Sequence, residues 1–160
     1  MDKEYLRAAI IRQLEAELDT QIRAARDSHD EATSEESKPE NKYDMHSQEA
    51  AYLAEGQARL AGELASAIEA WRTLPLPAGG THVATGSLVV LEDGSGKLHR
   101  YFLGPQRGGL SVETGDGEIT VLTPTAPLGR QLLGRVPGDS VPLPGRRPAT
   151  ASAARIVHIA

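Results

Sequence analysis

The glycines and prolines of this 160-residue chain are unevenly distributed, and that distribution limits the folds open to it. Residues 1–73 contain one proline, Pro39, and two glycines, Gly56 and Gly62, whereas residues 74–160 hold the other nine prolines and fourteen glycines. The first part is rich in Ala, Leu, Glu, Gln and Arg, which favour helix. The second has β-branched runs between turns, which are typical of strands. We therefore expect a helical module over 1–73 and a β-rich domain over 81–160, joined by a short linker at 74–80 that its prolines stiffen.

Both helical segments carry apolar residues at the spacing of a coiled coil. The seam expected in the second segment is Ala50, Leu53, Gln57, Leu60, Leu64, Ala67 and Trp71. The seam expected in the first is Ile11, Leu14, Leu18, Ile22 and Ala25. Pairing residues whose numbers sum to 75 sets apolar side chains on apolar side chains and places the turn between Ser37 and Lys38. This predicts an antiparallel coiled-coil hairpin with arms of about 30 residues, or ~45 Å; a parallel dimer through the same seams is the alternative.

The segment between the two helices, residues 30–44, holds six carboxylates and two lysines. In a hairpin these carboxylates collect at the tip. A charge run is usually solvated surface, but a projecting acidic tip is also suited to hold a metal ion or a basic partner.

The β-rich part predicts strands over 85–91, 99–103, 118–122 and 155–159, the first two joined by a glycine-containing loop at 92–97. A short helix is expected over 127–133, capped by Thr125 and stopped by Gly134. The fold class is therefore α+β. Since Tyr101 and Phe102 occupy successive strand positions, one is expected to face the core and the other to face outward.

Composition excludes several classes of protein. The chain has no cysteine, so it has no disulfide framework or thiolate metal site. It has no apolar run of the ~18 residues that span a membrane and no signal-peptide pattern at its start, so a cytoplasmic protein is expected. Residues 1–75 carry 9 basic and 16 acidic residues, which argues against strong binding to duplex DNA. Without a Walker loop or a nucleophile elbow, the chain is not expected to be an enzyme on its own.

Residues 126–135, Ala-Pro-Leu-Gly-Arg-Gln-Leu-Leu-Gly-Arg, are followed at 137–141 by Pro-Gly-Asp-Ser-Val. This string resembles the signature of the Gre-type (GreA/GreB) transcript-cleavage factors, in which a Ser-Pro helix with a basic residue and a Leu-Leu-Gly end precedes a Gly-Asp-x-Val turn. The order of parts, an acidic-tipped helical hairpin and then a β-rich domain, is similar over nearly the whole chain.

The resemblance implies a C-terminal domain with an FKBP-like fold that docks on core RNA polymerase, and a hairpin that enters the secondary channel. Tip carboxylates would then help to place a second Mg²⁺ at the polymerase active centre, and backtracked RNA would be cut. The implied catalytic carboxylates are Glu40 and Glu36, supported at the tip by Glu35, Asn41, Tyr43 and Asp44. The implied docking residues are Arg130, Leu132, Leu133, Arg135 and Asp139. No intrinsic cofactor is expected, no metal is expected to bind stably to the isolated chain, and a monomer without membrane contact is expected.

The tip departs from the family pattern. Glu40 and Asn41 match the Glu-Asn pair, but Tyr43 comes one position early, Pro39 acts as an insertion, and Lys42 replaces an alanine or acid. A channel-binding regulator or inhibitor that does not stimulate cleavage is therefore the alternative function. A prolyl isomerase and a coiled-coil adaptor are further alternatives, the first disfavoured because this domain has two aromatic residues.

Two other features have simpler interpretations. His29 and His46 would face each other below the tip, where a polar rung is favoured over a shared metal ion. Trp71 would pack at the base of the hairpin rather than recognise a partner.

Overall fold

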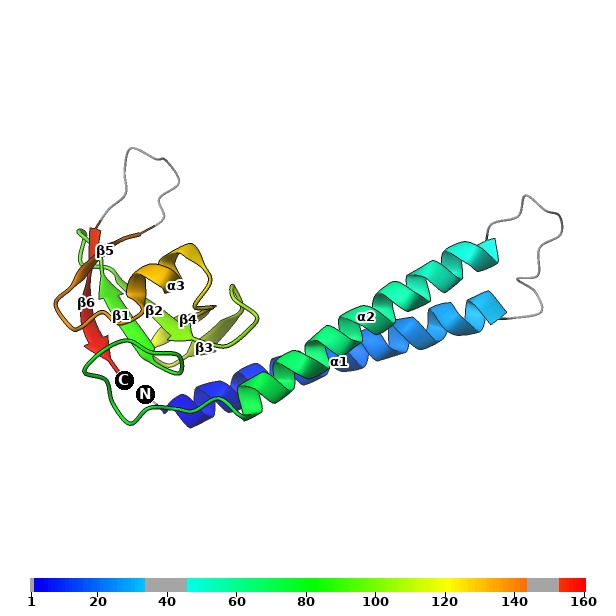
Figure 1. The fold of residues 1–160 in the computed structure, drawn as a ribbon, viewed down its shortest axis with the longest axis horizontal. Helices are drawn as coiled ribbons and strands as arrows, with labels where there is room; N and C mark the ends of the chain where they lie inside the picture. The colour runs from blue at the N-terminus through cyan, green and yellow to red at the C-terminus, as the bar shows by residue number, and fades with distance from the viewer. Residues whose placement is uncertain (1, 34–45, 144–152) are drawn as a thin grey trace. The chain divides into compact units, whose positions relative to one another are not determined.

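The computed structural model describes residues 2–33, 46–143 and 153–160 (Figure 1). The chain folds into two compact units. One unit is the helical span Ile11–Glu69, and the other combines Met1–Ile10 with Ala70–Ala160. The second unit thus includes the beginning of the first helix and the end of the second, together with the β-rich part.

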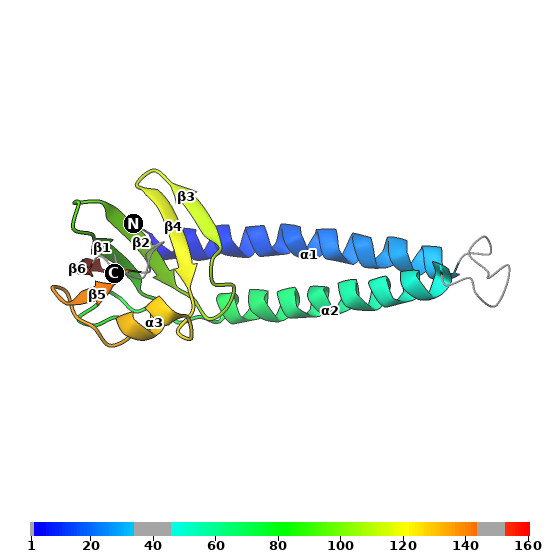
Figure 2. The same ribbon diagram turned by 90° about the horizontal axis from the view of Figure 1, so that it is seen from above.

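Two long helices form the predicted hairpin. Helix α1 spans Lys3–Thr33, 31 residues, and α2 spans His46–Arg72, 27 residues. Figures 1 and 2 show them side by side and antiparallel along their length. At 1.5 Å per residue they are about 46 Å and about 40 Å long. Within the described ranges, no helix combines the length and apolarity needed to cross a membrane.

The packing between the helices differs from the predicted seam in one respect. Leu14 and Leu64 are buried, as expected, but Leu53 and Leu60 leave 54% and 40% of their surface exposed. Ala54 and Ala61, each one residue further along α2, line the space facing α1 instead. The predicted placement of both leucines in the seam is therefore wrong. Two apolar rows overlap on α2, and the spacing alone does not choose between them.

The expected α+β class is confirmed, because the hairpin is followed by a six-stranded sheet of order β3-β4-β2-β1-β6-β5. The strands are β1 (Leu88–Glu92), β2 (Leu98–Leu103), β3 (Ser111–Thr114), β4 (Gly117–Leu122), β5 (Ser140–Pro142) and β6 (Ala153–Ile159). Neighbours are antiparallel except for β2 and β4, which are parallel. The sequence predicted β1, β2, β4 and β6; it missed β3 and β5, the short strands at the two edges.

One face of the sheet is covered by α3 (Pro127–Leu132), whose Leu128 and Leu132 join the main core. The core contributed by the strands and flanking segments is Val83, Val89, Leu91, Leu103, Val141, Leu143, Ala154, Ile156 and Ile159. Tyr101 packs against this core while remaining half-buried. The predicted cap of α3 is wrong: Ala126 occupies the N-cap without a side-chain bond, and the hydroxyl of Thr125 pairs with that of Thr123.

The opposite face of the sheet holds Phe102, which is fully buried and pairs in register with Leu88 and Val121. The Trp71 ring lies on Phe102 with 5.5 Å between ring centroids. A Cβ on Gly104 would lie 2.2 Å from the same indole. The core interpretation of Trp71 is thus confirmed. Near the start of α1, Arg7 donates a hydrogen bond to the Leu74 carbonyl at 3.1 Å, and Lys3 donates one to the Pro77 carbonyl.

Candidate functional site

The predicted tip residues lie outside the described part of the chain: Glu35, Glu36, Glu40, Asn41, Tyr43 and Asp44. The structure does describe the helices on either side of them. Because α1 ends at Thr33 and α2 begins at His46, the antiparallel pair brings both ends of the acidic segment to one end of the hairpin. Asp27, Asp30 and Glu49, in the turns of helix nearest that end, are exposed carboxylates.

Residues of α1 and α2 line an open surface groove of about 870 Å³ in the distal part of the hairpin. Ile22 and Ala25 line it from α1, and Ala51, Ala54, Ala58 and Ala61 from α2. Arg26, His29, Asp30 and Glu55 also border it. His29 is thus at the groove, whereas the side chain of His46, its predicted neighbour, lies outside the described residues. Across the described ranges, no three His, Asp or Glu side chains converge as a metal site requires.

Four of the five residues predicted to dock on a partner, Arg130, Leu133, Arg135 and Asp139, lie on α3 and the turn that leads to β5; we call this the α3–β5 surface. Leu132 has no exposed area, so it holds α3 on the sheet and presents nothing to a partner. Its neighbour Leu133 leaves 38% of its surface exposed, and Arg130 is exposed as well. Gly134 ends the helix with a φ of 76°, the left-handed conformation that glycine adopts readily.

Backbone hydrogen bonds fix this surface to the sheet domain. Val83 donates to the carbonyl of Arg135 and accepts from the N–H of Gly134, both at 2.8 Å. Ile156 donates to the carbonyl of Asp139, also at 2.8 Å. The Asp139 carboxylate accepts from the Val136 N–H at 3.2 Å and lies 3.9 Å from the Arg135 guanidinium. These hydrogen bonds fix the backbone of the surface, on which Arg130 and Arg135 lie beside the exposed apolar side chains of Leu133 and Val136.

Val136 belongs to this surface but was missed by sequence reasoning. It leaves 44% of its surface exposed between Arg135 and Pro137. No periodic pattern marks a single valine in a turn. The exposure follows from the turn that Gly134 and Gly138, both at positive φ, impose on the backbone.

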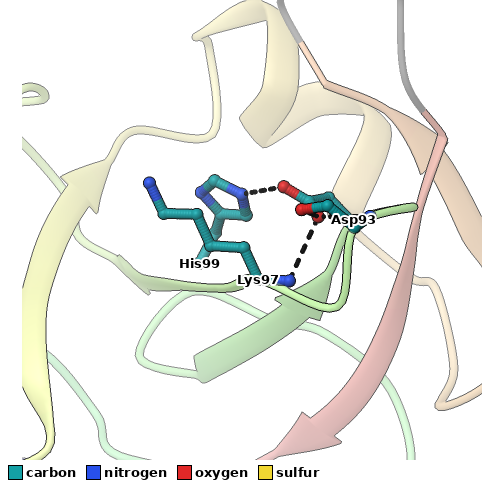
Figure 3. A network of polar contacts seen from close by, with 4 residues as sticks. Asp93, Lys97 and His99 are labelled. Carbon is teal, nitrogen blue, oxygen red and sulfur yellow. Dashed lines mark hydrogen bonds and ion pairs between the residues drawn. The ribbon is translucent and has the colours of Figure 1, made fainter.

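A second polar cluster lies in the β1–β2 loop (Figure 3). One oxygen of Asp93 accepts from the Ser95 N–H and hydroxyl and from the Lys97 N–H, at 2.6 to 3.1 Å. The other oxygen lies 2.8 Å from Nε2 of His99. The Ser95 hydroxyl and His99 lower the pKa of the Asp93 carboxyl well below its usual range, with a further contribution from the Ser95 N–H. The cluster is thus a carboxylate that orders its own loop.

Beside this loop is a cavity of about 300 Å³, lined by Lys97, His99, Tyr101, Glu118 and Thr120 among others. Burial raises the pKa of the Tyr101 phenol. An aspartate-held histidine suits general-base chemistry, but the Ser95 hydroxyl donates to Asp93 and not to His99. The arrangement therefore supplies no activated serine, and its contacts are those of a stabilised hairpin loop.

Comparison with known proteins gives matches among solved structures. No protein-family model matches the chain, and no curated protein matches it. A structure of GreA factor homolog 1 (Gfh1) of Thermus thermophilus is similar at 18% identity over 94% of each chain, with a TM-score of 0.37. The Gfh1 of Thermus aquaticus is similar at 19% identity over 92% of each chain, with a TM-score of 0.38.

A third similar structure is the prokaryotic transcription elongation factor GreA/GreB from Nitrosomonas europaea. Its identity to this chain is 27%, over 65% of this chain and 78% of its own, with a TM-score of 0.36. These solved structures are Gre-type transcription factors, the group that residues 126–141 resemble.

Proposed function

We propose that this chain is a transcription elongation factor that binds core RNA polymerase, extends its hairpin into the secondary channel and stimulates cleavage of backtracked transcripts. One observation carries the proposal: α1 and α2 are antiparallel, so the two helix ends that flank the acidic segment, Thr33 and His46, lie at the same end of a long arm. It would act in the cytoplasm as a regulator of the polymerase's own hydrolysis, not as an enzyme.

Two-metal hydrolysis requires only one or two carboxylate ligands from the tip. Hydrolysis of a phosphodiester by two metal ions needs a second divalent ion to activate water or stabilise the leaving oxygen. Mg²⁺ is commonly held by one or two protein carboxylates, with water and phosphate oxygens filling its octahedron. Glu40 and Glu36 are the carboxylates we assign to this role, and the metal would be that of the polymerase active site.

Docking on the polymerase is assigned to the α3–β5 surface. Arg130 and Arg135 offer cations beside Leu133 and Val136, which are apolar and exposed. Arginine is enriched at protein interfaces, and the buried core of an interface is more apolar than its rim. Leu132 supports this surface from the core and does not touch the partner.

The test uses bacterial RNA polymerase stalled in a backtracked complex that carries 3′-labelled RNA. Adding the protein with Mg²⁺ is expected to release short labelled fragments, and Glu40→Ala is expected to abolish the release. Glu36→Ala should reduce it. Glu63→Ala, which removes an exposed carboxylate of α2 far from the tip, is the matched control and should cleave like the wild type. Equal cleavage by Glu40→Ala and Glu63→Ala would contradict the assignment.

The unusual tip spacing favours a second candidate, a factor that occupies the channel without stimulating cleavage. Pro39 and Lys42 interrupt the acidic string at its centre. In that case the same assay gives no fragments, while the protein still binds the complex and displaces a cleavage-competent factor. Absence of both cleavage and binding would contradict both candidates.

Docking is tested separately from cleavage. Leu133→Ser and Arg130→Glu should weaken binding to core polymerase, because each removes a contact at the centre of the α3–β5 surface. Leu98→Ser is the matched control, since Leu98 is exposed to a similar extent, 42%, on β2. If Leu133→Ser binds as tightly as Leu98→Ser, the α3–β5 surface is not the docking site.

A further inference from the structure

The seam between α1 and α2 changes from apolar to polar along the hairpin. In its proximal part Leu14 of α1 and Leu64 of α2 are fully buried. One heptad further toward the tip, the same rows continue with Gln21 and Gln57, whose side-chain amide oxygens are buried and have no hydrogen-bond partner among the described residues. Ser28 follows on α1 and is buried as well. The distal parts of the two helices therefore bury little apolar surface against each other.

The apolar side chains of the distal hairpin lie on its open groove instead. Ile22 and Ala25 line the groove from α1, and alanines 51, 54, 58 and 61 line it from α2. These alanines have the alternating three- and four-residue spacing that keeps side chains on one side of a helix. The surface that the hairpin leaves open is thus an apolar stripe on each of its two helices.

Both stripes continue beyond the groove toward the base of the hairpin. On α1, Leu18 comes one turn before Ile22 and Ile11 one heptad before Leu18, and both are half-buried. On α2, Ala65 comes one turn after Ala61 and is exposed. We call the two stripes together the groove face; its members are Ile11, Leu18, Ile22 and Ala25 of α1, and Ala51, Ala54, Ala58, Ala61 and Ala65 of α2.

The area of the groove face is that of a weak protein interface. From Ile11 to Ala25 and His29, the stripe on α1 is about 25 Å long, and two packed helices are about 18–20 Å across. The face therefore covers roughly 500 Å², and two such faces in contact bury roughly 1,000 Å² in total, the lower limit for a specific interface. Contiguous apolar surface of this extent on a soluble protein marks an interaction site.

The groove face is complementary to itself in side-chain size. Its α1 stripe holds the large residues, among them Leu18 and Ile22, whereas its α2 stripe consists of alanines. When α1 of one copy lies on α2 of another, large side chains meet small ones along the whole contact, which is how helix pairs fill space without voids. A two-fold axis parallel to the hairpin makes this contact twice.

The charges at the borders of the groove are complementary in the same arrangement. Arg26 borders the groove from α1, and Glu55 borders it from α2. Because the groove sets residues 22–30 beside residues 51–61, these two side chains lie at a similar height along the hairpin. An axis parallel to the hairpin leaves heights unchanged, so Arg26 of each copy faces Glu55 of the other. An antiparallel pair of hairpins would instead place α1 on α1, and like charges would share a border.

We propose that the groove face binds a second copy of this chain, so that two parallel hairpins form a four-helix bundle whose neighbouring helices are antiparallel. The arrangement brings the exposed carboxylates of both copies, Asp27, Asp30 and Glu49, to one end, and their repulsion keeps the dimer weak. The dimer is therefore reversible, with a micromolar Kd, in place of the monomer that the family resemblance implies. The proposal concerns the hairpin surface and does not depend on polymerase binding.

Sedimentation equilibrium of the full-length protein tests the proposal. The mass of the wild type should rise from monomer to dimer as its concentration increases to about 300 μM, where a complex with a micromolar Kd is mostly formed. Ala58→Glu places an unpaired carboxylate at the centre of the interface twice, and should raise the Kd about 100-fold or more. Ala58 is exposed in the single chain and glutamate favours helix, so the hairpin itself should remain folded.

Leu60→Glu is the matched control. It introduces the same charge two residues further along α2 and removes a larger apolar side chain, 40% exposed, that is not part of the groove wall. This variant should dimerise like the wild type, and far-ultraviolet circular dichroism confirms that both variants are helical. A wild type that remains a monomer at about 300 μM overturns the proposal. Dissociation by Leu60→Glu to the same extent as by Ala58→Glu also overturns it.

A charge exchange tests the orientation of the two copies. Arg26→Glu and Glu55→Arg each place like charges opposite one another in the parallel dimer, so each should raise the Kd several-fold. The double variant, Arg26→Glu with Glu55→Arg, restores opposite charges and should recover the Kd of the wild type. Because both positions are exposed, none of these variants disturbs the fold of the single chain. A double variant that dimerises no better than the two single variants overturns the parallel arrangement.

Discussion

Two glycines of the sheet domain, Gly104 and Gly129, and the two glycines of α2 have opposite surroundings. A Cβ at Gly129 would lie 2.0 Å from the Thr123 carbonyl oxygen, and one at Gly104 would lie 2.2 Å from the Trp71 ring. At Gly56 and Gly62 of α2 a Cβ would have nothing within 4 Å. At Gly104 and Gly129, therefore, glycine allows segments to approach closely, whereas in α2 it weakens a helix with no gain in packing.

This difference shows which region of the chain has its backbone fixed by close packing and which does not. In the sheet domain, the α3–β5 surface has a fixed backbone, because close contacts and backbone hydrogen bonds hold α3 and the turns around it. The distal hairpin consists of two long helices that carry exposed carboxylates, Asp27, Asp30 and Glu49, near their distal ends. Local stability should accordingly be high around α3 and low in the distal half of the hairpin.

The largest effect is expected from Trp71→Ala. Trp71 is fully buried against Phe102 and Gly104, and truncating a buried tryptophan costs about 3–5 kcal/mol. Urea denaturation should show this loss of unfolding free energy. Trp71→Phe is the control and should lose much less, since the indole N–H has no hydrogen-bond partner among the described residues. A loss below about 1 kcal/mol for Trp71→Ala would mean that this face of the sheet is not a true core.

Gly129→Ala should have the next largest effect. The added methyl group would meet a backbone oxygen, which cannot move aside as a side chain can. Overpacking of this kind typically costs about 1–3 kcal/mol, and α3 should shift or loosen. Thermal unfolding measures the loss, with Gly115→Ala as the control because a Cβ there has nothing within 4 Å. Equal melting temperatures for the two variants would contradict the close approach of α3 to Thr123.

The sequence predicted the hairpin, the α+β class and four of the strands, because each of these has a local signal several residues long. It missed β3 and β5, which have four and three residues. Such short strands form because a neighbouring strand is available to pair with them: β4 for β3, and β6 for β5. Their formation depends on tertiary pairing more than on their own propensity.

At the candidate site, the motif in residues 126–141 located the α3–β5 surface but not the role of each leucine. Leu132 and Leu133 are adjacent and chemically identical, yet the first is fully buried and the second is exposed. Which of them faces the core depends on how α3 lies on the sheet. The leucines of α2 pose the same problem, since two heptad phases fit the sequence and, at the base of the helix, Ala67 of one phase and Ile68 of the other are both buried.

Gly62→Ala should stabilise the hairpin. Gly62 lies in the interior of α2 with open space around it, so alanine adds about 1 kcal/mol of helix stability without a clash. Amide hydrogen exchange should show slower exchange in the distal half of α2 and little change in the sheet domain. Gly56→Ala should act in the same direction. Faster exchange in either variant would mean that the glycine is required, and that the contrast with the sheet domain does not hold.

The smallest effect is expected from Asp93→Asn, which tests a region ordered by hydrogen bonds at the surface. The pKa of the Asp93 carboxyl is lowered in the folded protein by the Ser95 hydroxyl and His99. Its contribution to stability is therefore complete above the unfolded value of about 3.9 and is lost as the pH falls toward the lower, folded value. Wild type should be more stable than Asp93→Asn at pH 7, and the difference should shrink below about pH 4.

Urea midpoints measured across this pH range give the result directly. Asp116→Asn, which removes an exposed carboxylate from the β3–β4 turn, is the control. A constant gap between wild type and Asp93→Asn from neutral to acid pH would show that the charge on Asp93 does not order the loop. The β1–β2 loop would then be held, as α3 is, by backbone and packing.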